Sequence, residues 1–126
     1  MKIDKDLVAA SATPLVLGIL AEGESSYGYA ILKRIRELSD HNLDWTDGML
    51  YPLLHRLERL GHVESSWQVS DEGRRRKHYC LTDSGRQALA ERQNQWAVVS
   101  DALDRIWQTR TMLPTPNLAT PKVVTP

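Results

Sequence analysis

The sequence predicts a mainly α-helical (α+β) domain that ends in a long C-terminal helix. Three apolar segments with helical spacing come first, within residues 7–61. The period then changes to two over residues 62–81, which is typical of a β-hairpin. A last segment from Thr82 returns to helical spacing. The expected order is therefore helix, helix, helix, hairpin, helix, which is that of a winged helix-turn-helix domain with an additional C-terminal helix.

The first two predicted helices lie before residue 40. Residues 7–21 form an apolar block, and Gly23 follows it, as expected just past a helix end. Pro14 lies inside the block and either kinks the helix or marks the start of its ordered part. Ser25 or Ser26 is the expected N-cap of the second helix. The buried stripe of that helix is predicted at Tyr27, Ile31, Ile35 and Leu38.

The third predicted helix has one apolar and one polar face. Thr46 is its expected N-cap and Gly61 follows its end. Pro52 leaves open that the regular helix begins only near Tyr51, because its ring disturbs the preceding turn. The apolar face consists of leucines at helical spacing: Leu50, Leu53, Leu54, Leu57 and Leu60. The polar side chains expected on the opposite face are Asp47, Tyr51, His55, Arg56 and Arg59.

The predicted hairpin has an unusually basic second strand. Residues 62–67 and 77–81 alternate, and the segment 70–73 has turn composition. Cys80 is expected on the opposite face from Tyr79, so it is a buried structural thiol if Tyr79 points outward. The basic residues are consecutive: Arg74, Arg75, Arg76 and Lys77.

The last predicted helix needs a partner. Thr82 is its expected N-cap, and its apolar residues repeat as in a coiled-coil seam: Leu89, Trp96, Val99, Leu103 and Ile106. A single helix cannot bury such a seam, so we expect a homodimer that forms through residues 82–112. Residues 1–112 are therefore predicted as one domain. The remaining residues, 113–126, are rich in Pro and Thr and are expected to be disordered.

Composition narrows the class of protein. Sixteen basic residues balance sixteen acidic ones, so a chain that binds nucleic acid must separate its charges in space. Neither a signal peptide nor a membrane span is expected, and a cytoplasmic location is the default interpretation. The four histidines and Cys80 form no metal-ligand set and no nucleophile motif. We therefore expect no enzyme activity, no metal and no cofactor.

The arrangement favours binding to double-stranded DNA. In a helix-turn-helix unit the second helix of the pair enters the major groove, and a basic hairpin beside it can contact phosphates or the minor groove. A basic run alone is more often a solvated loop, and its position after a three-helix unit favours the DNA interpretation. The alternative is a winged helix that binds another protein. The candidate DNA-binding residues are Tyr51, His55, Arg56, Arg59, Arg74, Arg75, Arg76 and Lys77.

Several motifs in this order resemble the PadR family of transcriptional regulators, and the resemblance extends from about residue 14 to residue 106. The segments that carry it are Tyr27-Gly28-Tyr29, residues 49–54 followed by Arg56-Leu57-Glu58 and Gly61, residues 75–79, and Leu81-Thr82-Asp83-Ser84-Gly85. The resemblance implies a homodimeric repressor with a winged-helix DNA-binding domain. It also implies release from a pseudo-palindromic operator when a small aromatic effector binds. The single C-terminal helix is similar to that of the compact members of the family.

The resemblance also implies a position for the effector. In compact members, paired Trp side chains on the last helix enclose flat aromatic ligands between subunits, and Trp96 is at the matching position. Arg92 and Ser100 lie one turn to either side and are polar, so the pocket accepts a polar or acidic aromatic, or else it is closed. The alternative is that Trp96 is only a large core residue of the dimer seam.

Overall fold

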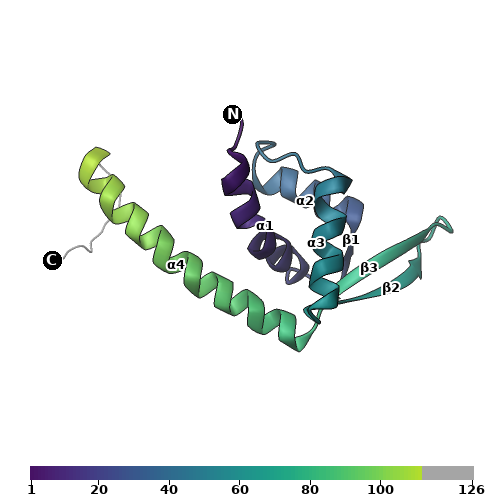
Figure 1. Cartoon of the computed structure of the whole chain (residues 1–126). Coiled ribbons are helices and arrows are strands. Elements are labelled where there is room, and N and C mark those ends of the chain that lie inside the picture. The colour runs from purple at the N-terminus through teal and green to yellow at the C-terminus, as the bar shows by residue number, and fades with distance from the viewer. Residues whose placement is uncertain (112–126) are drawn as a thin grey trace. The chain divides into compact units, whose positions relative to one another are not determined.

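The computed structural model describes residues 1–111 of the chain, with side chains to residue 108. The prediction of a disordered tail over 113–126 lies outside the described residues. Contacts divide the chain into a first unit, residues 1–93, and a second unit that begins at Asn94. The first unit contains the helices α1, α2 and α3, a three-stranded sheet and the start of helix α4 (Figure 1). The elements follow the predicted order, with one additional short strand.

Helix α1 extends from Lys5 to Leu20 and continues through Pro14. Its N-cap is Asp4, whose carboxylate accepts a hydrogen bond from the backbone N–H of Asp6 at 2.8 Å. The possibility that Pro14 marks the start of the ordered helix is therefore wrong. The helix tolerates the missing N–H because its apolar face is buried in the core, and tertiary packing supplies most of the stability of a helix in a protein. The buried residues are Thr13, Val16, Leu17, Ile19 and Leu20.

The segment before helix α2 is a strand and not a helix cap. Ser26–Tyr27 form strand β1, and α2 extends from Gly28 to Leu38. The predicted Ser25 or Ser26 cap is wrong, because the N-cap residue of α2 is Tyr27, and Ser26 lies in β1, which pairs with the later strand β3. Ile31 and Ile35 are buried as predicted, whereas Leu38 is half exposed at the C-terminal end of α2.

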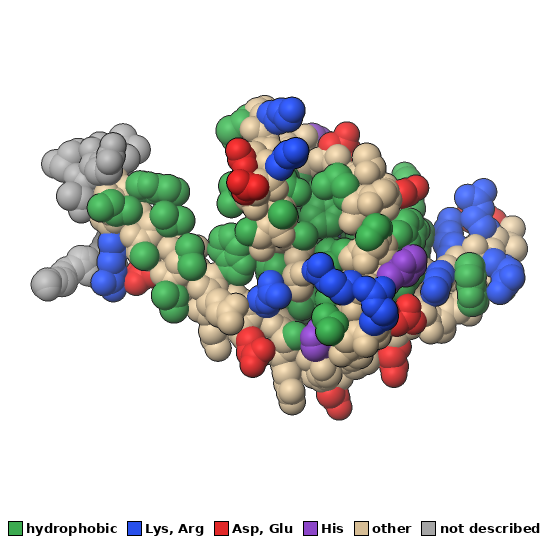
Figure 2. Space-filling model, viewed as in Figure 1, with side chains coloured by type: hydrophobic (Ala, Val, Ile, Leu, Met, Phe, Trp, Pro, Cys, Tyr) green, Lys and Arg blue, Asp and Glu red, His purple; other side chains and the backbone are tan. Residues whose placement is uncertain are grey.

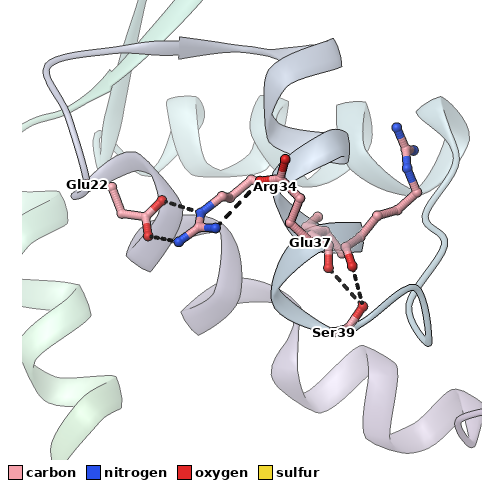
Figure 3. A network of polar contacts seen from close by, with 6 residues as sticks. Glu22, Arg34, Glu37 and Ser39 are labelled. Carbon is pink, nitrogen blue, oxygen red and sulfur yellow. Dashed lines mark hydrogen bonds and ion pairs between the residues drawn. The ribbon is translucent and has the colours of Figure 1, made fainter.

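A polar network connects the end of α1 to α2 (Figure 3). Arg34 of α2 donates two hydrogen bonds to Glu22, at 2.9 and 2.8 Å, and lies 3.5 Å from Glu37. This bidentate pairing lowers the pKa of Glu22, chiefly through the hydrogen bond from Arg34. Ser39 donates to the carbonyl oxygen of Ile35 at 2.9 Å and closes the last turn of α2.

Helix α3 extends from Asp47 to Arg59 and also continues through a proline, Pro52. The alternative that the helix begins only near Tyr51 is wrong. Thr46 is the N-cap residue, but its side chain makes no capping hydrogen bond. Leu60, predicted in the apolar stripe, is 58% exposed because it lies just beyond the helix end. The buried face consists of the other predicted leucines: Leu50, Leu53, Leu54 and Leu57.

The wing is an antiparallel hairpin of β2, Val63–Val69, and β3, Arg75–Leu81. Strand β3 is central in the sheet order β1-β3-β2. Gly73 has a φ of +81° at the turn, a conformation that glycine adopts without strain. Tyr79 is buried and points into the core, so the neighbouring Cys80 points to the opposite face of the sheet and is only half-buried. The condition under which Cys80 would be a buried structural thiol, an outward Tyr79, is therefore not met.

Helix α4 extends from Asp83 to Thr111. Thr82 caps it as predicted, because its hydroxyl oxygen accepts from the backbone N–H of Gly85 at 3.0 Å. The same hydroxyl donates to the carbonyl oxygen of Gly61 at 2.6 Å, which joins the end of α3 to the start of α4. Leu89 packs against the core of the first unit. In the second unit the apolar side chains of the predicted seam are exposed: Val99, Leu103 and Ile106.

One hydrophobic core joins α1, α2, α3 and the inner face of the sheet. It contains Trp45 from the loop before α3, and Val63, Tyr79 and Leu81 from the wing. Helices α2 and α3 form the helix-turn-helix pair, and β2 and β3 form the wing. The protein is a winged helix-turn-helix domain with a long C-terminal helix, as the sequence predicts.

Candidate nucleic-acid interface

A groove of about 530 Å³ lies between helix α3, strand β1 and the wing. Cationic and aromatic side chains provide nearly all of its lining, and it belongs entirely to the first unit. Figure 2 shows basic side chains gathered over the wing, at the right of the view. The lining residues are Tyr27, Gly28, Tyr29, Tyr51, His55, Trp67, Arg74, Arg75, Arg76, Lys77 and Tyr79.

Helix α3 contributes Tyr51 and His55 to the groove. They lie one turn apart on the flank of α3 that faces the wing, and their ring centroids are 6.4 Å apart. Tyr51 is half-buried and packs against the core. Its hydroxyl fills the space beside Gly28, where a Cβ atom would collide with it. Gly28 therefore lets the phenol lie close to the first turn of α2, and the hydroxyl keeps a fixed place in the groove.

The wing contributes four consecutive cations, three of which lie over aromatic rings. The guanidinium carbon of Arg75 is 4.7 Å from the ring centroid of Trp67. That of Arg76 is 4.5 Å from the centroid of Tyr27, and the ammonium of Lys77 is 5.8 Å from that of Tyr79. Within residues 1–108, no ion pair joins any of these cations to a carboxylate. Their positive charge is therefore available to an anionic partner.

A hydrogen bond holds the wing beside α3. The hydroxyl of Ser65 on β2 donates to Glu58 Oε2 at 2.6 Å, one helical turn beyond the groove. Burial, with a smaller contribution from Glu58, raises the pKa of the nearby Tyr79 hydroxyl. The Tyr79 hydroxyl is buried and has no hydrogen-bond partner among the described residues. The Ser65–Glu58 hydrogen bond therefore links β2 of the wing to the last turn of α3.

The structure separates the predicted site residues into two sets. Tyr51, His55 and the wing cations meet in the groove. Arg56 lies on the other flank of α3, where its Nη2 donates to the hydroxyl of Thr13 in α1 at 3.3 Å. Arg59 is exposed as the last residue of α3 and does not line the groove. Sequence reasoning placed all four α3 residues on one face, because helical periodicity does not say which neighbour each flank meets.

Sequence reasoning missed the aromatic lining of the groove. Tyr27, Tyr29, Trp67 and Tyr79 come from four different elements: β1, α2, β2 and β3. The available signal was the alternation of the hairpin, which places Trp67 opposite the basic run. The alternation alone does not give the register that pairs Trp67 with Lys77.

The predicted effector residues lie on α4. Trp96 is half-buried in the single chain, and Arg92 and Ser100 are exposed. Trp96 and Ser100 belong to the second unit, whereas Arg92 belongs to the first.

Among the described residues, no cluster of three or more His, Cys, Asp or Glu side chains could hold a metal ion. No helix in the described part of the chain is long and apolar enough to cross a membrane.

Residues 16–91 match a family described as the transcriptional regulator PadR-like family. The chain belongs to this family. A PadR-family regulator from Eggerthella lenta is 36% identical, with 82% of this chain and 88% of that chain covered and a TM-score of 0.67. A PadR-like regulator from Bacillus cereus is 26% identical, with 82% and 98% covered and a TM-score of 0.73. A transcriptional regulator of Mycobacterium tuberculosis is 48% identical over 56 residues, which are 44% of this chain and 51% of that protein.

Membership confirms the resemblance inferred from the motifs. The PadR-like family consists of transcriptional regulators, so the protein is a regulator of transcription and not an enzyme. The matched residues, 16–91, include helices α2 and α3, the wing and the start of α4. They therefore contain the whole cationic groove.

Proposed function

We propose that this PadR-family protein is a repressor that binds a pseudo-palindromic operator as a homodimer and releases it when an aromatic effector binds. The observation that supports DNA binding best is the cationic groove between α3 and the wing. A DNA phosphate backbone carries a dense negative charge, and unpaired cations on a protein release its counterions on binding. The neutral net charge of the chain does not oppose this, because the wing concentrates four cations in four residues.

Helix α3 and the wing, which form the two sides of the groove, make different kinds of contact with DNA. Helix α3 has the size of the recognition helix that fits the major groove, and His55 and the hydroxyl of Tyr51 lie on the flank that faces the wing. The wing cations then lie beside the same stretch of duplex and contact phosphates, which fixes register but carries no sequence information directly. Arg59 and Arg56 remain candidates for contacts along the outer part of α3.

The homodimer is supported by the exposed apolar side chains of α4. Val99, Leu103 and Ile106 are 50%, 37% and 56% exposed in the single chain. Soluble proteins rarely leave such a stripe uncovered, and a second copy of the same helix covers it symmetrically. A two-fold axis would place two α3 helices on half-sites about 34 Å apart along the duplex.

The effector site is proposed on the dimer axis at Trp96, with Arg92 and Ser100 beside it. A half-buried Trp on an unpartnered seam offers a ring face to a flat ligand, and Arg92 favours an acidic one. For the ligand to cause release, it must bind more tightly to the form that does not bind DNA, and a coupling of about 1–3 kcal/mol is typical.

The alternative function is a winged helix that binds a protein. It shares the fold, and it predicts no preference for DNA sequence. Fluorescence anisotropy of a labelled duplex from upstream of the protein's own gene, with a scrambled duplex as competitor, distinguishes the two. Tight binding that resists the competitor supports the repressor. The repressor function would be contradicted if the folded dimer bound several genomic duplexes no more tightly than the scrambled duplex.

A further inference from the structure

We propose that Trp67 and Tyr27 are positioning residues for DNA binding, each of which orients one arginine of the wing toward a separate phosphate. The proposal rests on the proposed binding of DNA by the groove. It assigns a role to two aromatic residues that the basic run alone does not suggest. The pairs are Arg75 with Trp67 on one face of the sheet, and Arg76 with Tyr27 on the other.

The register of the sheet places the two pairs on different faces. Trp67 pairs with Lys77 across β2 and β3, so Trp67 shares a face with Lys77 and with Arg75, two residues earlier. Tyr27 pairs with His78 across β1 and β3, so it shares the other face with His78 and Arg76. The ring centroids of Tyr27 and His78 are 5.2 Å apart, which supports this assignment.

Trp67 has no large structural role of its own. It is 59% exposed, on a hairpin strand whose outer residues are in solvent. A Trp this exposed on a wing adds little to the core, and the guanidinium of Arg75 lies over its ring, 4.7 Å from the centroid. Tyr27 is half-buried immediately before α2, and it holds Arg76 at 4.5 Å.

Stacking suits an arginine that must bind phosphate. A cation–π contact uses the flat face of the guanidinium, whereas the N–H donors lie in its plane and point outward from the edge. The stacked arginine is therefore ordered without losing its donors. A free arginine would lose side-chain entropy on binding, and a stacked one has lost part of it already.

The two faces imply two phosphates. Successive strand residues point to opposite faces, so the stacked Arg75 and Arg76 leave β3 on different sides and are expected to meet different phosphates. Arg75 lies on the sheet face of Tyr79 and Arg76 on the opposite face, and both side chains line the groove. We therefore expect the two arginines to contribute independently, and each pair to act without the other.

The test is a pair of double-mutant cycles on DNA affinity. Replacing Trp67 by Leu removes the ring face but leaves every charge, so the affinity should fall about twofold to fivefold, the loss expected from a cation–π contact at an exposed site. The slope of log affinity against log salt should stay unchanged, because the number of cations is the same. In an Arg75→Ala background, Trp67→Leu should have no further effect.

Conservative and control variants distinguish a role of Trp67 and Tyr27 in orienting the arginines from a role in stabilising the fold. Trp67→Phe keeps a ring face and should retain most of the affinity. For the Trp67 cycle the control is Ser66→Ala, which changes an exposed side chain of the same strand on the sheet face opposite Trp67 and should leave the affinity unchanged. The second cycle uses Tyr27→Leu with Arg76→Ala, and Tyr27→Phe should behave as wild type because the stack needs no hydroxyl.

A measurement without DNA distinguishes failure of this proposal from failure of the proposed function. In wild type and Trp67→Phe, the Nε–Hε resonance of Arg75 should show a ring-current shift that Trp67→Leu removes. If that shift is present and no duplex binds, the pairing stands and the DNA function fails. If Trp67→Leu lowers affinity equally with and without Arg75, or if the shift is absent in wild type, the positioning role is wrong.

Discussion

The start of helix α4 leaves no room for a side chain at Gly85. A Cβ atom there would collide with the carbonyl oxygen of His62 and would lie 3.1 Å from Cδ2 of Leu81. The same carbonyl oxygen accepts a hydrogen bond from the backbone N–H of Thr82 at 3.1 Å. Because the obstacle is backbone in a hydrogen-bonded turn, it cannot move aside without weakening the junction between the wing and α4.

Two opposing effects set the size of the change in Gly85→Ala. Overpacking at a filled site costs about 1–3 kcal/mol. Alanine in a helix gains about 1 kcal/mol over glycine. Since the collision is with backbone, we expect an overpacking cost near the upper end of that range. After the helix-propensity gain is subtracted, the free energy of unfolding should fall by about 1–2 kcal/mol. The chain is intermediate between the sizes for which 1 kcal/mol shifts Tm by about 4–8 °C and by about 2–4 °C, so the expected decrease in Tm is roughly 3–12 °C.

Thermal unfolding followed by circular dichroism measures the effect, at one fixed protein concentration because dimerisation makes Tm depend on concentration. The matched control is Gly48→Ala in the first turn of α3, where the nearest atom to a new Cβ is Thr46 Oγ1 at 3.7 Å. This variant should be as stable as wild type or more stable. A Gly85→Ala protein that melts at or above the wild-type temperature would refute the packing argument.

Three further predictions concern the groove, the effector site and the α1–α2 network. Arg75→Ala should weaken binding to all duplexes and lower the slope of log affinity against log salt by about one, measured by anisotropy; a loss for one DNA sequence only would contradict phosphate contact. Trp96→Ala should keep duplex binding but lose release by aromatic ligands; a monomer in sedimentation would instead support a purely structural Trp. Arg34 lowers the pKa of Glu22 below its ordinary 4.5, so its stabilisation is present above that pH and is lost as pH falls through the folded-state pKa. Glu22→Gln should therefore lower Tm slightly at neutral pH, with a difference that disappears on acidification in a series of melts.

Sequence patterns predicted the long elements of the fold because their burial is periodic. The leucines of α3 from Leu50 to Leu57 are buried at the predicted spacing, and the hairpin turn falls at Gly73 as expected. Thr82 caps α4 because it combines a hydroxyl with the start of an apolar period. These features depend on neighbours in sequence, which a single chain displays directly.

The features of the fold that the sequence did not predict depend on contacts between segments that are distant in the chain. Strand β1 has only two residues, and its pairing with β3 joins Tyr27 to His78, 51 positions later. No local pattern predicts such a pair, so Ser25 and Ser26 were expected to cap a helix. The burial of Tyr79 rather than Cys80 depends on which sheet face meets the helices. Periodicity gives alternation but not this direction.

The candidate site could be predicted in part for the same reason. The basic run from Arg74 to Lys77 is visible in sequence, and its meeting with Tyr51 and His55 followed from the expected fold. Arg56 was grouped with them although it bonds to Thr13 of α1. The aromatic partners of the arginines come from β1 and β2, and only the register of the sheet brings them together.

The central claim is that the groove between α3 and the wing is the surface that binds DNA. Backbone amide chemical shifts of the labelled protein, recorded with and without an operator duplex, test it most directly. The largest changes are expected at Tyr51, His55 and residues 74–77, with small changes along residues 5–20 of α1. Changes concentrated on α1 or on residues 94–108 of α4, with the wing unaffected, would contradict it.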